Sequence, residues 1–79
     1  MSDFIATFHT HLSALLSCRS LTEQGAVAQM MPVPRALSSS CGTCVRYSAQ
    51  DAHLDALDED TEAVYEVCGG EYRLLLQKE

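Results

Sequence analysis

Two prolines separated by a single residue limit what the middle of this chain can form. Pro32 and Pro34 each fix their own backbone angle φ and lack a backbone N–H group. They also disfavour the α region for the residues before them, Met31 and Val33. A central strand cannot continue here, because its hydrogen-bond ladder needs those N–H groups. The sequence therefore predicts a strand that ends at the prolines and a loop that follows it.

The predicted loop carries an unusual concentration of polar and thiol chemistry. Ser38, Ser39 and Ser40 offer hydroxyls and free backbone N–H groups directly before Cys41. Gly42 permits a tight or left-handed turn beside that thiol. We therefore expect Cys41 to be presented on a polar loop at the end of a strand.

The length of the chain limits how large the interior of the protein can be. We expect one small domain over residues 1–79. Such a chain buries only roughly 60–65% of its unfolded surface. A large internal active-site cavity is therefore not expected, and Leu, Val, Met and Ala must supply most of the packing.

The charge balance argues against two classes of partner. The net charge is −6, and the five basic residues are scattered without forming a basic run. Nucleic acid and an anionic membrane surface are disfavoured for this reason, whereas a basic partner protein would suit the chain.

The amino terminus has no signal-peptide pattern, and no stretch approaches transmembrane length. We therefore expect a cytoplasmic protein, in a reducing compartment where structural disulfides are rare. The four cysteines are accordingly expected to be free thiols.

Local patterns predict alternating strands and helices. Residues 3–9 favour a strand. Residues 11–24 favour a helix that is capped by Thr10 and ended by Gly25. Its apolar arc is expected to contain Leu12, Leu15 and Leu16, continued by Ala14, Cys18 and Leu21. Strands are predicted over residues 26–33 and 43–47.

The second half of the chain predicts a helix followed by a hairpin. Ser48 to Asp51 resembles a capping box, so a second helix is expected from Ser48 to about Asp58, with the acids at 58–60 in a solvated loop. Residues 63–68 and 71–77 favour strands joined by the turn at residues 69–70. This order predicts an α+β, ferredoxin-like βαββαβ sandwich with a C-terminal β-hairpin extension.

The run from Pro32 to Gly42, followed by Val45-Arg46-Tyr47, resembles the signature of the selenium/sulfur carrier protein-like family. The resemblance extends over nearly the whole chain. It implies that Cys41 is the carrier thiol, with Arg35, Ser38 and Gly42 around it. A carrier needs a donor, such as a cysteine desulfurase, and an acceptor protein. The residues show no phosphate-loop glycine pattern and no catalytic carboxylate pair, so neither turnover of its own nor a cofactor is expected. Cys44 departs from the family pattern.

The residues themselves support a reactive thiol at Cys41. A carrier needs an accessible thiolate, and nearby cations or unpaired N–H groups favour that form. Arg35 and Arg46 are the candidate cations. The N–H groups of Ser38, Ser39 and Ser40 could form an anion-binding concavity.

Other interpretations of the cysteines remain open. The Cys41-Gly42-Thr43-Cys44 spacing also fits a redox pair with Cys44 as resolving thiol. It lacks the second half of a zinc site, and no metal is expected. Cys18 is expected on the apolar arc of the first helix, in the core of the protein. The histidines are expected to be ordinary helix-flanking residues.

Two further functions remain open. One is a non-catalytic interaction or homodimerisation module that uses an exposed sheet edge. The other is a thiol–disulfide redox protein that uses Cys41 and Cys44.

Overall fold

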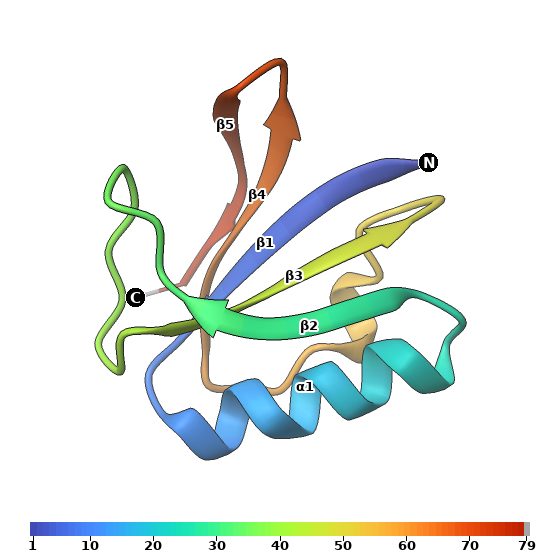
Figure 1. The fold of residues 1–79 in the computed structure, drawn as a ribbon. Helices are drawn as coiled ribbons and strands as arrows, with labels where there is room; N and C mark the ends of the chain where they lie inside the picture. Colours follow the sequence, from blue (N-terminus) through green and yellow to red (C-terminus); the bar gives the residue numbers. More distant parts are fainter. Residues whose placement is uncertain (79) are drawn as a thin grey trace.

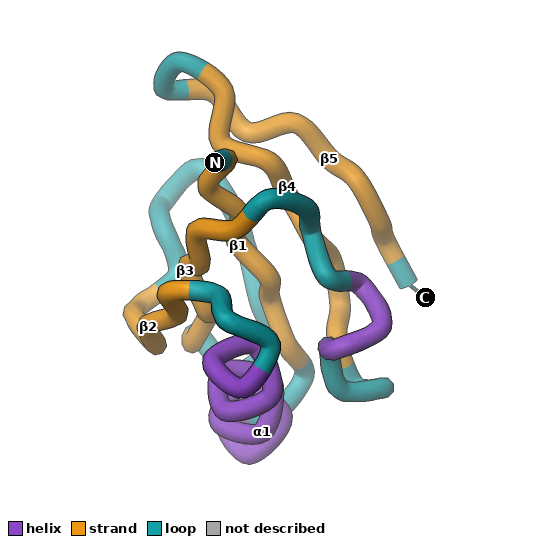
Figure 2. The backbone as a smooth tube through the Cα atoms, turned by 90° about the vertical axis from the view of Figure 1, so that its right-hand side faces the viewer, coloured by secondary structure: helices purple, strands orange, loops and turns teal. Residues whose placement is uncertain are grey.

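The central strand of the molecule is the first one in the chain. The computed structural model describes residues 1–78 and forms a five-stranded sheet in the order β2-β3-β1-β4-β5, in which every neighbouring pair is antiparallel (Figure 1). The elements are β1 (Ser2–Phe8), α1 (His11–Glu23), β2 (Val27–Pro32), β3 (Thr43–Ala49), the 3₁₀ turn η1 (Leu54–Ala56), β4 (Thr61–Cys68) and β5 (Glu71–Gln77). The view in Figure 2 shows α1 on one side of this sheet.

Alternating residues of β1 and β3 form the core between the sheet and α1. Phe4 and Tyr47 are direct cross-strand partners, and their rings stack with centroids 5.2 Å apart. Phe8 and Val45 continue the same buried cluster. The Tyr47 hydroxyl donates a 2.6 Å hydrogen bond to the carbonyl of Ala52, which satisfies its polar end. Burial, and secondarily Asp51, raises the pKa of Tyr47.

Both predicted ends of α1 are confirmed. The Thr10 hydroxyl accepts a hydrogen bond from the Ser13 N–H at 3.1 Å, as an N-cap should. At the other end Gly25 has a φ of +92°, and the Ala26 N–H bonds back to the Leu21 carbonyl. This Schellman geometry favours glycine because it needs a positive φ.

The predicted apolar arc of α1 is confirmed only in part. Its members Ala14 and Leu21 are buried, together with Ser13 and Ser17. Its other leucines, Leu12, Leu15 and Leu16, are 62%, 41% and 45% exposed. The face toward the sheet consists mainly of small side chains, so these three leucines lie at the surface.

Asp58 explains why two serines are buried under α1. The Ser13 hydroxyl donates to the Asp58 carboxylate at 2.8 Å, and the Asp58 backbone N–H donates to the Ser17 hydroxyl at 2.8 Å. Asp58 therefore bonds to α1 through both its side chain and its backbone, and the expectation that this acid is solvated is wrong.

The predicted second helix is wrong, so the ferredoxin-like βαββαβ topology is not confirmed. Strand β3 continues to Ala49, because the Ser48 hydroxyl donates to Asp3 of the neighbouring strand instead of capping a helix. The Asp51 carboxylate then accepts from the His53 N–H in a turn whose His53 φ is +47°. Within residues 1–78 the fold is a small α+β structure with one α-helix and a five-stranded antiparallel sheet.

The predicted C-terminal hairpin is confirmed. Strands β4 and β5 pair through the Gly69–Gly70 turn, where both glycines have a positive φ of 55° and 86°. No helix within residues 1–78 is long and apolar enough to cross a membrane.

Removing the Tyr47 hydroxyl tests the polar end of this core. We expect Tyr47→Phe to lower the free energy of unfolding by about 1 kcal/mol, because the Ala52 carbonyl loses its partner. Urea unfolding followed by circular dichroism measures this. Tyr72→Phe, on β5 at the surface groove described below, is the matched control and should leave the midpoint unchanged. Equal midpoints for all three proteins would contradict a stabilising role for this hydrogen bond.

Candidate functional site

A backbone hydrogen bond closes the base of the loop between β2 and β3. Beyond the last β2–β3 pair, the Val33 N–H donates to the Gly42 carbonyl at 3.1 Å. The Leu37 N–H donates to the Pro34 carbonyl at 3.0 Å, which forms a turn near the tip. Gly42 has a φ of +73°, the left-handed conformation that glycine tolerates best. Residues 33–42 therefore leave the sheet at one point and return to it at the same point.

Cys41 lies near the base of this loop and is half-buried. Its thiol donates to the Thr43 carbonyl at 3.5 Å, and the Ser39 hydroxyl lies 3.8 Å from its sulfur. Its side chain also packs against the core cluster beneath α1. The thiol thus combines a polar contact on one side with apolar packing on the other.

Two serines fasten the loop to neighbouring strands. The Ser39 hydroxyl donates to the Phe8 carbonyl at the end of β1 at 2.8 Å. Ser40 bonds to Glu62 at the start of β4 twice, from its N–H at 2.8 Å and from its hydroxyl at 2.9 Å. These residues flank Cys41 on its amino-terminal side, so the sheet determines where the thiol lies.

Two histidines join the same region. His9 Nδ1 lies 3.4 Å from the Ser40 hydroxyl and 3.6 Å from a Glu62 carboxylate oxygen. His11 Nδ1 lies 3.3 Å from the hydroxyl of Thr43. The Ser40 hydroxyl donates to the carboxylate rather than to the imidazole, so these groups are not ordered as a nucleophile–base triad.

Glu62 and both of these histidines were not predicted from the sequence as site residues. Nothing in their spacing reveals them, because they lie far from Cys41 along the chain. The signal is the strand register: Thr7 pairs with Cys44 and with Ala63. That register brings the end of β1 and the start of β4 to the start of β3, where the loop returns.

Glu62 is held mainly as an anion. Partial burial acts to raise the pKa of this carboxyl, but the hydrogen bonds from Ser40 and the nearby His9 imidazole outweigh it and lower the pKa below its ordinary value. The carboxylate side chain is only 22% exposed. Its hydrogen bonds are therefore charge-assisted and partly shielded from water.

Cys44 lies in an environment opposite to that of Cys41. It is fully buried, and its thiol lies 3.7 Å from the Pro32 carbonyl. Burial first, and then the nearby Cys41, raise the pKa of this thiol, although Arg46 acts in the other direction. Cys44 and Arg46 share the sheet face opposite to Val45 and Tyr47.

The two remaining cysteines are unlike either of these. Cys18 on α1 is half-buried against the core, where burial raises the pKa of its thiol. Cys68 is exposed at the end of β4. All four cysteines are free thiols.

The candidate arginines do not contact the thiol. Arg46 forms an ion pair with Asp3 at 2.8 Å. Hydrogen bonds from Ser48 first, and then from Arg46, lower the pKa of Asp3. Arg35 is exposed in the loop and makes no hydrogen bond or ion pair within residues 1–78. The exposed Ser38 likewise makes no side-chain hydrogen bond there. The polar neighbours of the Cys41 sulfur are thus one hydroxyl and one backbone carbonyl rather than a guanidinium group.

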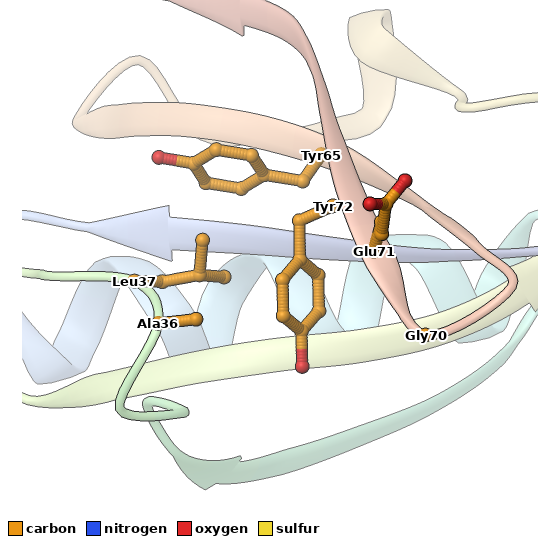
Figure 3. Close-up of a pocket in the computed structure, with 6 residues that line it drawn as sticks. All are labelled: Ala36, Leu37, Tyr65, Gly70, Glu71 and Tyr72. Atoms are coloured by element: carbon orange, nitrogen blue, oxygen red, sulfur yellow. The ribbon is translucent and has the colours of Figure 1, made fainter.

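The tip of the loop forms one wall of an open groove of about 670 Å³. Ala36 and Leu37 lie opposite Tyr65 and Tyr72 of the β4–β5 hairpin (Figure 3). Tyr65 is the cross-strand partner of Ile5, which points away from the core cluster beneath α1. The tip therefore lies over the sheet face opposite α1, while Cys41 stays at the end of the sheet.

One family model matches most of the chain. Residues 3–70 match the model of a family described as "Putative Se/S carrier protein-like". The chain belongs to this family. No curated protein and no solved structure matches the chain. The Se/S carrier protein-like match includes the whole loop, both serine anchors and Glu62.

The Glu62 contacts predict a pH dependence of stability. A group whose pKa is lowered on folding stabilises the folded state above its unfolded pKa, here close to the ordinary value of 4.5, and that stabilisation is lost as pH falls through the lower folded value. At neutral pH we expect Glu62→Gln to cost about 1 kcal/mol. The difference from wild type should shrink as pH falls below the ordinary glutamate value.

Urea unfolding across the acidic range measures this difference. The matched control is Glu59→Gln, because Glu59 is exposed and makes no side-chain hydrogen bond within the described residues. A stability difference for Glu62→Gln that is the same at every pH would contradict the assigned interaction.

Proposed function

We propose that this protein carries sulfur or selenium on Cys41 and delivers it to an acceptor protein. Membership of the Se/S carrier protein-like family supports the general activity. The observation that carries the choice of residue is the setting of the thiol: Cys41 lies on the loop that resembles the family signature, half-buried and beside hydroxyl groups. Burial raises the pKa of both Cys44 and Cys18, and Cys68 lies on a distant hairpin.

Loading is a thiol exchange that needs no external oxidant. The Cys41 thiolate attacks the outer sulfur of a persulfide on a donor such as a cysteine desulfurase. A new S–S bond forms on Cys41 as the S–S bond of the donor breaks, and the donor thiolate leaves with the electron pair. Delivery to the acceptor thiol repeats the same exchange, and selenium follows the same balance. A reducing cytoplasm would keep the acceptor and carrier thiols free.

The hydroxyl of Ser39 has a role in this step. A thiolate has no proton to donate to the Thr43 carbonyl, so that hydrogen bond is lost when Cys41 ionises. The Ser39 hydroxyl lies 3.8 Å from the sulfur and can turn its single proton from the Phe8 carbonyl to the anion. Hydrogen bonds to the charged form favour that form.

The expected result of a loading experiment is specific to one thiol. Wild-type protein incubated with a cysteine desulfurase and cysteine should gain the mass of one sulfur atom, measured by intact-protein mass spectrometry. Cys41→Ser should gain none, because its hydroxyl cannot form a persulfide. Cys68→Ser, at an exposed and distant thiol, is the matched control and should load like wild type.

Loading that survives Cys41→Ser would contradict the proposal. Wild-type protein that gains no sulfur would leave the interaction module as the better function. One observation favours that alternative independently: Leu12, Leu15 and Leu16 form an exposed apolar row on α1. The open edges of β2 and β5, in a strand order compatible with a ferredoxin-like sheet that has lost its second helix, offer a homodimer or a partner strand a further place to pair.

Burial weighs against the redox alternative, in which Cys44 resolves Cys41. We expect iodoacetamide to modify Cys44 at least about tenfold more slowly than Cys68 in the folded protein, because a fully buried thiol with a raised pKa is rarely a thiolate. Peptide mass spectrometry over time measures both sites in one chain. Rapid modification of Cys44, or a Cys41–Cys44 disulfide after mild oxidation, would instead favour the redox pair.

A further inference from the structure

We propose that Glu62 is a positioning residue for Cys41: its carboxylate holds Ser40 and so fixes the thiol at the end of the sheet. The proposal rests on the proposed carrier function. Glu62 lies outside the signature loop, on strand β4. Its proposed role is in the transfer of sulfur or selenium between proteins and not in activation of the thiol.

The geometry of the contact is that of a two-point clamp. One carboxylate oxygen accepts the Ser40 N–H at 2.8 Å and the other accepts the Ser40 hydroxyl at 2.9 Å. Two bonds from a single residue to the two oxygens of one carboxylate fix orientation as well as distance. Because Ser40 is bonded covalently to Cys41, fixing the Ser40 backbone restricts where the Cys41 side chain can point.

The clamp joins strand β4 of the sheet to a loop that has no regular secondary structure. Glu62 lies in β4, which pairs with the central strand β1, and its backbone carbonyl accepts from the Lys78 N–H at 2.8 Å. Residues 33–42 have no helix or strand of their own. A side chain with a locked backbone can hold such a loop close to one productive geometry, which a loop alone does poorly.

The Glu62 carboxylate bonds to Ser40 and not to the Cys41 sulfur. Its role is therefore to hold the loop rather than to activate the thiol. Glutamine at this position can accept only one of the two hydrogen bonds, which loosens the loop. Glu62→Gln should make the half-buried Cys41 more accessible to a small reagent and less efficient in exchange with a protein donor. These two opposite effects separate positioning from activation.

The experiment measures both rates in wild type, Glu62→Gln and the control Glu59→Gln. Iodoacetamide modification of Cys41 is expressed relative to the exposed Cys68 of the same chain. Persulfide transfer from a loaded cysteine desulfurase is measured as kcat/KM. We expect the Glu62→Gln alkylation ratio to rise and its transfer to fall by about tenfold or more, with Glu59→Gln unchanged in both.

Two further readouts exclude a merely structural effect. The reactivity of Cys44 toward iodoacetamide shows whether the protein is folded. This thiol is fully buried and should stay unreactive in Glu62→Gln unless the sheet opens. The Ser40 amide proton should shift in NMR spectra as Glu62 is titrated with acid, and this shift should vanish in Glu62→Gln. His9 is the other titratable group in contact with the clamp, so the titration is repeated in His9→Asn.

Each outcome is decisive. Unchanged transfer in Glu62→Gln, or an increase in both rates, overturns the positioning role while leaving the carrier intact. A fall in transfer accompanied by modification of Cys44 also overturns it, because the effect would then come from unfolding. Wild-type protein that never loads overturns the carrier function itself, and loading that persists in Cys41→Ser overturns the choice of Cys41; in both cases the Ser40 titration would still test the clamp.

Discussion

The pairing of β1 with both of its neighbours is the interaction on which the rest of the structure depends. β1 bonds to β3 on one side and to β4 on the other, and Thr7 is paired with Cys44 and with Ala63. Three chain segments that are distant in sequence therefore meet where β1 ends. Phe8 offers its carbonyl to Ser39 there, and Glu62 accepts from Ser40. A shift of one residue in this register would separate the loop from both anchors and turn core residues to the wrong face.

In this small protein, hydrogen bonds of serine hydroxyls hold segments of the chain against one another. In larger proteins the packing of apolar side chains does more of this. Asp58 joins Ser13 and Ser17 of α1, and Ser39 fastens the thiol loop to β1. A chain of 79 residues has little apolar surface to bury. Directional hydrogen bonds determine where each segment lies, and Leu12, Leu15 and Leu16 of α1 are left at the surface.

The features that could be predicted from the sequence are those with a local cause. The cap at Thr10, the positive φ at Gly25 and the Gly69–Gly70 turn depend on a few adjacent residues, and all are present. The buried face of α1 and the end of β3 depend on distant partners. Ser48 matches a helix cap by pattern, but Asp3 on another strand takes its hydroxyl. At the site, the loop and its cysteine were foreseeable, whereas Glu62 and His9 required the strand register.

Cys41 and Cys44 show how few residues separate a presented thiol from a structural one. They lie three positions apart, yet Cys44 has entered β3 and lost all contact with solvent, while Cys41 precedes the strand beside the left-handed Gly42. The turn at Gly42 makes this difference, because it directs the chain from the loop into the sheet between the two sulfurs. Cys41 is thereby held by the sheet through Ser39 and Ser40 without becoming part of it. This combination of fixed position and partial access is what group transfer between two proteins requires of a thiol.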